Sequence, residues 1–466
     1  MIIPVPEIKE ELLTFLKNID PENIRDQVIL RFAHKISSID FSNLIDSVIS
    51  GNNKVFYFNR PEEDFVLLAF DELLSIKIIG DNRFSILRSK ISDFTSHSIN
   101  NFDKVASQDF PLLLGGTKFC SDSKSDEWSD FAANDWFIPR FLFCKNDNEE
   151  YFIINLLING NEKIEKWVNE VLTHLDNLNN IHACADSGEQ ISSIKAVSNE
   201  NEMDHWGVLV DDALTKISEG LFKKVVLSRR LVADITGIPL FHTIVSQLRD
   251  SYRNCNIFLY KSNNSVLFGA TPEQLLKFRN NEIEFDALAG SARRGNTIDE
   301  DNKIAQNLLT DKKNGNEHNQ VIEFIRDVSL NYVQNFRQSG TGIKKFSNIQ
   351  HIYTPIKGIL KSRDQIYDLV EDIFPTPAIC GSPKTAALQY IIEHEKFDRG
   401  MFSGIIGFIN SNEMDLSVAI RSALFTHNKL FVYAGCGIVN GSDPRSEFEE
   451  TEIKMRPILS LFKNED

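Results

Sequence analysis

The chain has 466 residues, of which 42% are hydrophobic and 25% are charged, proportions typical of a globular protein. Its formal charge of -16 repels phosphate backbones and anionic lipid, which argues against nucleic-acid and membrane-surface binding. No segment approaches the about 20 apolar residues that a membrane-spanning helix needs, and residues 1–12 lack the basic start and apolar stretch of a signal peptide.

The first 200 residues give only local signals. Residues 55–70 predict two strands joined by a Pro-Glu-Glu-Asp turn. Residues 136–143 predict an apolar strand whose proline suits an edge or a bulge better than a central position. Because no Pro-, Gly- or Ser-rich linker interrupts the chain, we expect one domain over residues 1–466, with residues 1–200 packed against the rest.

The pattern sharpens from residue 204. Apolar residues at helical spacing predict a helix that ends at Gly220, and a strand begins at Lys224. Asn263 and Asn264 suit the tight turn of a hairpin. Further expected elements are that hairpin at 257–269, a strand at 283–288, and a helical stretch at 299–333 interrupted near Asn314-Gly315.

An antiparallel meander is expected near the C-terminus, over residues 402–409, 415–425 and 429–433, followed by a helix over 446–462. Strand runs alternate with separate helices, and no regular βαβ repeat is visible. The fold class is therefore predicted to be α+β, a single sandwich of antiparallel sheets with helices outside.

The last helix carries Glu447, Glu450 and Lys454 at positions i, i+3 and i+7, so the three side chains share one face. One interpretation is an acidic first turn that complements the helix dipole. The other is half of a site for a hard cation, because such cations prefer carboxylate oxygens.

The pair Glu317-His318 in the long helical stretch could supply the other half of that site. Spacing alone cannot link it to Glu450, and a Glu-His pair on a helix is also typical of a solvated face. Magnesium needs only one or two protein carboxylates, with water and substrate oxygens at its other positions. Glu317 with Glu450 would meet that need.

Thr271-Pro272-Glu273 follows the second strand of the hairpin. Thr271 suits the N-cap and Pro272 the first position of a helix, so the segment predicts a helix start. That interpretation does not exclude a catalytic role for Glu273.

Lys223 and Lys224 open an apolar strand, and side-chain alternation places them on opposite faces. One of the two must therefore point toward the packed side or a cavity. A partly desolvated lysine can act as a base, although a lysine that reaches back to the surface is the alternative.

Nine segments, in order, resemble the chorismate-utilising enzymes, which include isochorismate, salicylate, anthranilate and aminodeoxychorismate synthases. They are KVVLSR at 224–229, FGATPE at 268–273, ALAGSARRG at 287–295, EH at 317–318, QHIYTPIKG at 350–358, PTPAICGSP at 375–383, AIRSA at 419–423, AGCGIVNGSDP at 434–444 and EFEETEIK at 447–454. The catalytic portion of the family thus corresponds to residues 204–462. LGGTKF at 114–119 and WFIPRFLF at 136–143 also look like the variable front half of these enzymes.

The resemblance implies a sandwich of two antiparallel sheets flanked by helices, with chorismate as the substrate and Mg²⁺ as the cofactor. The residues that it implies fall into two groups, one for the metal and one for the substrate. Glu317 and Glu450, supported by Glu447, would hold Mg²⁺; Arg421, Lys454 and the backbone at Gly435 would bind the substrate's second carboxylate; Gly290, Ser291 and His351 would line the ring pocket.

The resemblance also indicates which reaction is catalysed. Members that use ammonia lack a lysine at the position of Lys224, so we expect water to attack ring carbon C2 with Lys224 as base. Glu273 would protonate the departing C4 hydroxyl. This is the chemistry of an isochorismate synthase, an isomerase, of the menaquinone or siderophore type. No glutamine-hydrolysing segment is present in the sequence, so we expect no amidotransferase subunit.

Three alternatives remain open. A salicylate synthase uses the same base and acid and then eliminates pyruvate, and Ala292 argues against it because arginine is usual there. An ammonia-using synthase is disfavoured by Lys224. A non-catalytic binding protein is disfavoured by the joint presence of the expected catalytic and metal-binding residues.

Three residues depart from the family pattern: Phe374 replaces a frequent His, Ser291 the usual Thr, and Asn314 a frequent acidic residue. The change at Asn314 makes the surroundings of the metal less negative.

Six scattered cysteines without a CxxC pair indicate free thiols in a reducing compartment, so we expect a cytoplasmic protein. They are Cys120, Cys144, Cys184, Cys255, Cys380 and Cys436.

Overall fold

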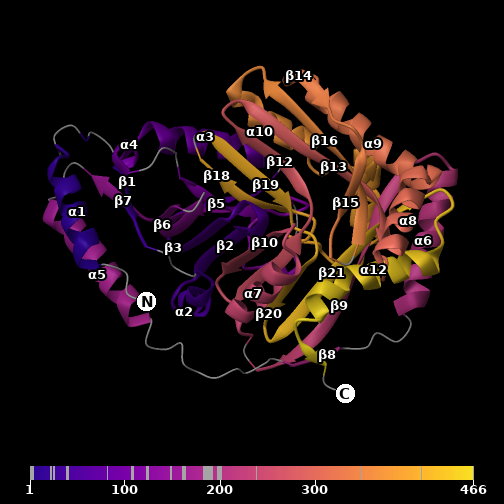
Figure 1. Cartoon of the computed structure of the whole chain (residues 1–466), viewed down its shortest axis with the longest axis horizontal. Helices are drawn as coiled ribbons and strands as arrows, with labels where there is room; N and C mark the ends of the chain where they lie inside the picture. The colour runs from indigo at the N-terminus through magenta and orange to yellow at the C-terminus, as the bar shows by residue number, and fades with distance from the viewer. Residues whose placement is uncertain are drawn as a thin grey trace.

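The computed structural model describes residues 5–20, 24, 27–37, 41–80, 82–105, 110–121, 125–146, 149–159, 164–181, 193–196, 202–237, 239–347, 349–410 and 412–464. Strands dominate these ranges and pair into one continuous network with two arms that meet at a shared strand, β6 (Figure 1). Almost every pairing is antiparallel, and β1–β4 and β22–β8 are the parallel exceptions. The expectation of an α+β fold with antiparallel sheets is confirmed.

The first arm runs from the N-terminal strands to those near the C-terminus. In spatial order it contains β4 (Ser98–Asn100), β1 (Gln27–Lys35), β7 (Glu149–Asn159), β6 (Asn134–Asn146), β3 (Phe65–Ile78), β2 (Lys54–Arg60), β10 (Asn256–Ser262), β11 (Ser265–Thr271), β20 (Ser422–Thr426), β21 (Lys429–Val439) and β9 (Lys224–Thr236). On β9 follow β17 (Gly381–Ser382) and β8 (Ser193–Ala196), and β22 (Lys463–Asn464) pairs with β8.

The second arm leaves β6 through β5 (Leu113–Thr117), which pairs with residues 134–137 of β6, whereas β7 pairs with residues 141–146. It contains β5, β18 (Ile405–Ile409), β19 (Glu413–Val418), β12 (Gln274–Arg279), β13 (Glu282–Arg293) and β16 (Ile349–Leu360), and β16 also pairs with β14 (Val333–Gln338) and β15 (Gly342–Lys345). Pairs such as β2–β10 and β5–β18 join strands of the first 200 residues to strands of the remainder.

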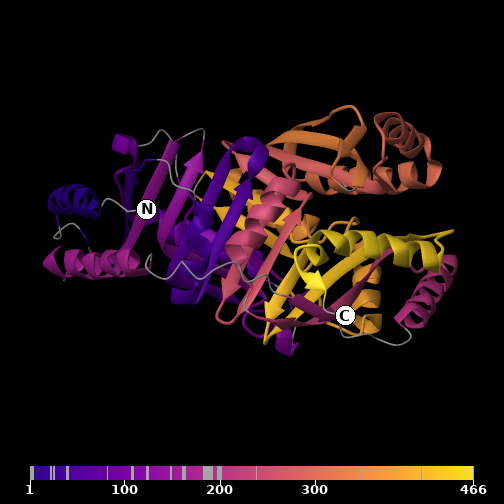
Figure 2. The ribbon, with the colours of Figure 1, turned by 60° about the horizontal axis from the view of Figure 1, so that its bottom comes forward.

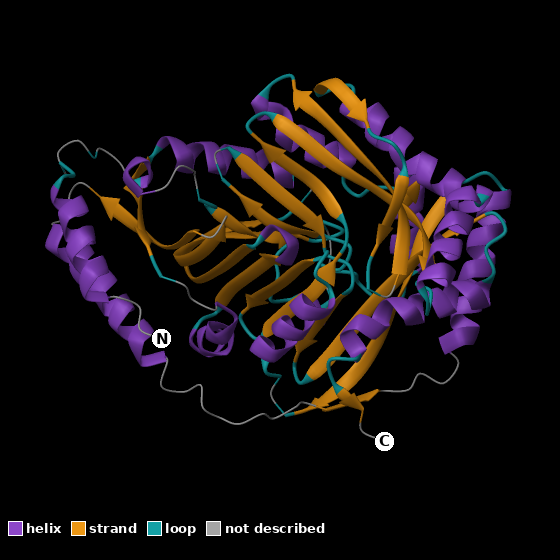
Figure 3. Cartoon of the chain, in the orientation of Figure 1, coloured by secondary structure: helices purple, strands orange, loops and turns teal. Residues whose placement is uncertain are grey.

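The helices lie on the outside of the strand network (Figure 3). They are α1 (Val5–Lys17), α2 (Ile45–Gly51), α3 (Arg83–Ser96), α4 (Phe102–Val105), α5 (Ile164–Ile181), α6 (Glu202–Ser218), α7 (Phe241–Ser251), α8 (Ile298–Thr310), α9 (Lys312–Ser329), α10 (Ile366–Ile373), α11 (Lys384–His394) and α12 (Pro444–Leu459). Helices α1 and α5 cover one end of the molecule, and α6, α8, α9 and α12 gather at the other (Figure 2). No helix in the described ranges is both long and apolar enough to cross a membrane.

The core contains aromatic side chains from both portions of the sequence. Phe56 and Phe58 on β2 pack with Phe258 and Tyr260 on the neighbouring strand β10, and all four are fully buried. Phe56 and Tyr260 meet edge to face, with ring centroids 5.7 Å apart. Burial of such rings supplies a large part of the hydrophobic free energy of folding.

Several expected elements are confirmed: the strand pair at 55–70, the helix ending before Gly220, the strand from Lys224, and the hairpin at 257–269, whose turn has Asn263 at φ 50°. The cysteines described, Cys120, Cys144, Cys255, Cys380 and Cys436, are free thiols, and Cys184 lies outside the described residues.

Of the edge or bulge expected for residues 136–143, the edge is absent, because β6 is paired on both sides, but a bulge is present. The irregularity that Pro139 requires is carried by the partner strand instead. The register of β3 shifts between Glu72 and Leu74, opposite Pro139. A proline inside a sheet is therefore accommodated by a bulge in its neighbour.

The interruption expected near Asn314-Gly315 lies at Asp311 instead. Asp311 separates α8 from α9 and caps α9, because its side chain accepts a hydrogen bond from the Asn314 amide. An aspartate with an extended backbone satisfies a free N–H of the first turn and so restarts a helix.

The helix start expected at Thr271 is also wrong. The Thr271 hydroxyl does accept a hydrogen bond from the Glu273 amide, at 3.2 Å, but β12 begins at Gln274 and no helix follows. The same hydroxyl donates to the Val418 carbonyl at 2.6 Å, and the Val418 amide donates to the Glu273 carbonyl at 3.0 Å. Sheet pairing to β19 thus overrides the local helix signal.

The stretch 415–425 is two strands rather than one. β19 pairs with β12 and β18 in the second arm, whereas β20 pairs with β11 and β21 in the first. The chain crosses between the arms at residues 419–421, where Arg421 has a left-handed backbone at φ 51°.

Candidate active site

A pocket of about 980 Å³, partly open to solvent, lies where the two arms face each other. One side is formed by β9, β21 and α12, and the other by β13, β16, α9 and the connection between β11 and β12. Nearly all the residues expected to act in catalysis or to bind the substrate or the metal line this pocket, although they come from distant segments. The exception is Lys224, which lies directly behind one of the lining residues, Gly437.

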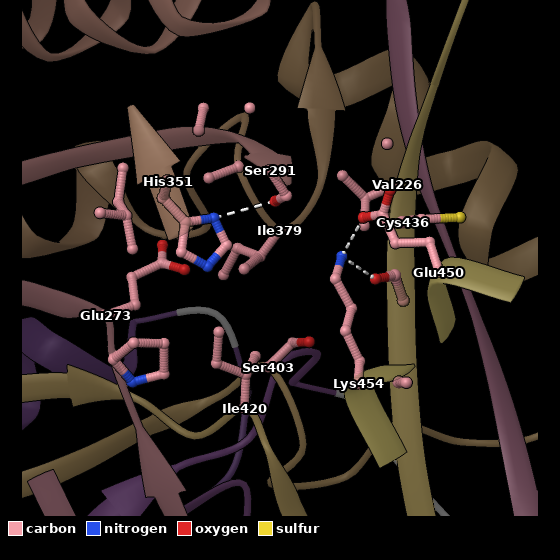
Figure 4. A pocket seen from close by; sticks show the side chains of 18 of the residues that line it. Val226, Glu273, Ser291, His351, Ile379, Ser403, Ile420, Cys436, Glu450 and Lys454 are labelled. Atoms are coloured by element: carbon pink, nitrogen blue, oxygen red, sulfur yellow. Dashed lines mark hydrogen bonds and ion pairs between the residues drawn. The ribbon is translucent and has the colours of Figure 1, made fainter. Parts of the chain in front are cut away.

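Glu273 lies on the side formed by the second arm (Figure 4). The residue is 8% exposed, and its carboxyl group makes no ion pair or hydrogen bond to any residue in the described ranges. Burial raises its pKa to about 7, against the opposing effects of Lys224, Lys454 and Arg421. A glutamate in this state holds a proton near neutral pH and can give it to a leaving group.

His351 lies beside Glu273 in the pocket (Figure 4). Its Nδ1 is 2.9 Å from the Ser291 hydroxyl, and its Nε2 is buried with no hydrogen-bond partner in the described ranges. Burial, helped by Arg421 and Lys454, holds the pKa of His351 well below its usual range, so the ring is neutral. A neutral ring with one unpaired nitrogen offers a hydrogen-bonding atom to a ligand.

Gly290 forms the turn of backbone that carries Ser291 into the pocket. The register between β13 and β16 shifts at this point, and Gly290 has φ 76°. A Cβ atom there would stand 3.1 Å from the Asn314 side chain. Glycine is therefore required both for the backbone conformation and for the approach of α9.

Lys224 is the first residue of β9 and is 1% exposed, whereas Lys223 is exposed, as expected from their alternation. The Lys224 ammonium donates a 2.6 Å hydrogen bond to Glu317 Oε1. A Cβ atom at Gly437 would stand 2.7 Å from Lys224 Cε and 3.0 Å from that oxygen. The missing side chain of Gly437 is what admits this ion pair at the edge of the pocket.

Helix α12 begins at Pro444 behind an Asp443 cap, which directs its first turns at the pocket. Lys454 bridges Glu450 Oε1 at 2.6 Å and the Gly435 carbonyl at 2.8 Å (Figure 4). Glu447 lies 3.4 Å from Lys313. Glu450 keeps 33% of its side-chain surface exposed. Burial opposes ionisation of Glu450, but Lys454 holds its pKa below the usual value.

Arg421 is 7% exposed, and its guanidinium makes no hydrogen bond or ion pair within the described ranges. Burial lowers its pKa, although arginine remains charged at any physiological pH. A buried cation without an internal partner is costly, and an anionic ligand removes that cost. Arg421 is therefore suited to bind an anionic group of a ligand, such as a carboxylate.

The three glutamates expected at a metal offer hard oxygen donors that all line the pocket. Each forms an ion pair with a lysine, and in the described ranges no three His, Cys, Asp or Glu side chains converge closely enough to hold a metal by themselves. Magnesium needs only one or two carboxylates and takes its other ligands from water and substrate. Glu317 and Glu450 fit that demand if their lysine partners yield.

Some side chains of the pocket were not predicted from the sequence. Lys313 precedes Glu317 by four positions, so helical spacing could have indicated that both reach the same cavity. His318 points away, with Nε2 2.8 Å from the Thr354 hydroxyl, and burial lowers its pKa to about 4. No pattern in the sequence distinguishes Ser403 and Cys436, which also line the pocket.

Comparison with known proteins gives concordant results. A family model described as chorismate binding enzyme matches residues 14–463. Isochorismate synthase MenF of Bacillus subtilis is 28% identical over 456 residues, which cover 95% of each chain. The salicylate biosynthesis isochorismate synthase of Pseudomonas aeruginosa is 34% identical over 441 residues, 93% of this chain and 91% of the relative. The structure of menaquinone-specific isochorismate synthase MenF from Escherichia coli has the same fold, with a TM-score of 0.79 at 20% identity over 97% of this chain and 99% of that one.

Proposed function

The chain belongs to the chorismate-binding enzymes, and we propose that it is an isochorismate synthase that uses Lys224 as base and Glu273 as acid. The observation that carries this assignment is the state of Glu273, a buried and unpaired carboxyl whose pKa of about 7 suits proton donation. Two relatives that are named isochorismate synthases match the chain over 95% and 93% of its length.

The reaction replaces the C4 hydroxyl of chorismate by a hydroxyl at C2. Lys224 takes a proton from the attacking water, and Glu273 gives its proton to the departing hydroxyl. Lys224 is held by Glu317 in this structure, so its role as a base requires that ion pair to open first. A positioned acid or base is worth about 10²–10⁴-fold in rate.

Substrate binding has to overcome the net charge of -16, because chorismate is a dianion. Arg421, Lys454 and the backbone at Gly435 take the enolpyruvyl carboxylate, and the unpaired state of Arg421 supports this role. Gly290, Ser291 and His351 line the ring. Cations concentrated in one pocket attract an anion that the molecule as a whole repels.

Glu317 and Glu450 would hold Mg²⁺, with Glu447 in support. The ion would neutralise and orient the ring carboxylate of chorismate. Glu317 comes from α9 and Glu450 from α12, and both helices line the pocket, where Lys313 of α9 lies 3.4 Å from Glu447 of α12.

Water rather than ammonia is the nucleophile, because Lys224 provides a base and the chain therefore needs no amidotransferase partner. The product serves menaquinone or siderophore synthesis, and the enzyme is cytoplasmic. An acidic chain with free buried thiols supports this location.

The test is to incubate the purified protein with chorismate and Mg²⁺ and to separate the products by chromatography. An isochorismate synthase gives a mixture of chorismate and isochorismate, with pyruvate at the uncatalysed background. Stoichiometric salicylate and pyruvate would establish the salicylate synthase alternative instead.

A further inference from the structure

Ser403 lines the pocket in a backbone conformation that serine rarely adopts. Its φ is 57°, in the left-handed region, and the residue is 2% exposed. A residue with a Cβ atom is disfavoured there, and such residues cluster at binding and catalytic sites. Glycine would occupy this position without strain, so the serine side chain calls for a reason.

The conformation is fixed by two chain reversals that are bonded to each other. The Ser403 amide donates to the Ala419 carbonyl at 3.0 Å, and the Ala419 amide returns a 2.8 Å bond to the Gly404 carbonyl. Two residues after Ala419 stands Arg421, whose φ of 51° is also left-handed. Two strained residues thus share one corner of the pocket.

The Ser403 hydroxyl makes no hydrogen bond to any residue in the described ranges, although most of the residue is buried. Its oxygen is not among the fully buried polar atoms that lack a partner, so it keeps some accessible surface. In Figure 4 its oxygen points into the space between Glu273 and His351 on one side and Glu450 and Lys454 on the other. The group is therefore free to bond a ligand.

We propose that the Ser403 hydroxyl donates a hydrogen bond to the enolpyruvyl carboxylate of chorismate, beside Arg421. The Arg421 guanidinium has only hydrogen-bond donors, so the ligand group that pairs with it is an anionic acceptor. A hydroxyl in the same corner donates to that acceptor, and the Lys454 ammonium lies across the cavity from Ser403 (Figure 4). This inference rests on the proposed substrate, and it makes Ser403 a specificity-determining residue.

Two substitutions distinguish the effect of the hydroxyl from the effect of the strained backbone. Ser403→Ala removes the hydroxyl and keeps the strained Cβ atom, whereas Ser403→Gly removes both. Calorimetry without added metal measures chorismate binding apart from turnover. The dissociation constant should rise about 10-fold in both variants, because a hydrogen bond to a charged acceptor is worth at least that much. Ser403→Gly should melt no lower than the parent.

A matched control is Ser422→Ala in the adjoining reversal, where the hydroxyl donates to the Ala419 carbonyl at 3.2 Å. This variant should bind chorismate as the parent does. A ring carboxylate without the enolpyruvyl group, such as 4-hydroxybenzoate, should bind the parent and both Ser403 variants equally.

Unchanged chorismate binding in both Ser403 variants, an equal loss of 4-hydroxybenzoate binding, or no chorismate binding by the parent would overturn the inference. Failure of the proposed function looks different: the parent binds chorismate with the expected dependence on Ser403, yet forms no isochorismate when Mg²⁺ is added.

Discussion

The two sides of the pocket hold glutamates in opposite electrostatic states. On the second arm, Glu273 is 8% exposed and has no ion-pair partner in the described ranges, and burial raises its pKa to about 7. On α12, Glu450 is 33% exposed and lies 2.6 Å from Lys454, which lowers its pKa. Residues of one type, in one cavity, are thus suited to proton donation on one side and to cation binding on the other.

The difference shows what decides whether a carboxyl group in this pocket is protonated or ionised. A cation in direct contact and access to water matter more than the fact that the group lines the pocket. Glu273 feels Lys224, Lys454 and Arg421 only at a distance, and desolvation dominates. Glu317, like Glu450, touches a lysine directly, at 2.6 Å. Enzymes that use two carboxylates in different roles separate them in this way.

The largest expected effect comes from the two lysine-paired glutamates expected at the metal, Glu317 and Glu450. Glu317→Gln or Glu450→Gln should abolish turnover, because each removes a charge from the site of a cation that must neutralise a carboxylate. A chelator should abolish activity of the parent, and Mg²⁺ should restore it. Initial rates with chorismate provide the measurement.

Glu449→Gln is the matched control, because Glu449 lies on the same helix and is 65% exposed. It should leave the rate unchanged. Full activity in a chelator-treated parent would contradict the assignment of the metal.

Lys224→Gln tests the ion pair at the edge of the pocket. The amide can still hydrogen-bond water but cannot accept its proton, so kcat should fall by about 10²–10⁴-fold. Chorismate binding should change little. Lys223→Gln, on the exposed face, should leave kcat unchanged. A loss of activity in Lys223→Gln together with full activity in Lys224→Gln would show that Lys224 is not the base.

Glu273→Gln removes the buried carboxyl group that is expected to donate the proton. The parent needs Glu273 protonated, so its kcat should decline as the pH rises above about 7, the pKa of this group. The variant should be about 10²–10⁴-fold slower and should lack that decline. A pH–rate profile that keeps the same descending limb in the variant would assign the acid elsewhere.

The raised pKa of Glu273 also affects stability. Between pH 4.5 and about 7 the folded chain keeps a proton that the unfolded chain releases, so this contribution is present below pH 4.5 and is lost as the pH rises through 7. The loss is at most about 3 kcal/mol. Denaturant unfolding should show Glu273→Gln gaining stability relative to the parent from pH 4.5 to pH 8.

Lys454→Met should change binding constants by the smallest factor. It leaves Glu450, like Glu273, without an ion-pair partner in the described ranges. Removal of the competing ammonium should tighten Mg²⁺ binding by the substrate-free protein several-fold, while chorismate binding weakens about 10-fold through loss of a charged hydrogen bond. Calorimetry measures both constants. Weaker Mg²⁺ binding in the variant would show that Lys454 does not compete with the metal.

The sequence predicted the sheet-rich fold and most of the pocket because these depend on local alternation and on ordered motifs. Glu447, Glu450 and Lys454 share a helix face by spacing alone. The helix start at Thr271 was predicted wrongly. This segment bonds to Val418 of β19, which lies 147 positions after Thr271, so local sequence could not indicate the pairing.

Ser403 could not be found from the sequence, because its role depends on a reversal bonded to Ala419. The expected strand over 415–425 hid the crossing between the arms that brings Arg421 into the pocket. Among the lysine partners of the glutamates, Lys454 shares a helix face with Glu450, and Lys313 shares α9 with Glu317, so helical spacing indicates both. The pairing of Lys224 with Glu317 joins a strand to a helix 93 positions away and could not be found from the sequence.

The most direct test of the opposite states of the two sides is infrared difference spectroscopy at pH 6. The spectrum of the parent minus that of Glu273→Gln should contain the C=O stretch of a protonated carboxyl, because the pKa of Glu273 is about 7. The spectrum of the parent minus that of Glu450→Gln should contain carboxylate bands instead, because Lys454 keeps Glu450 ionised. A carboxylate signal from Glu273, or a protonated carboxyl at Glu450, would contradict the account.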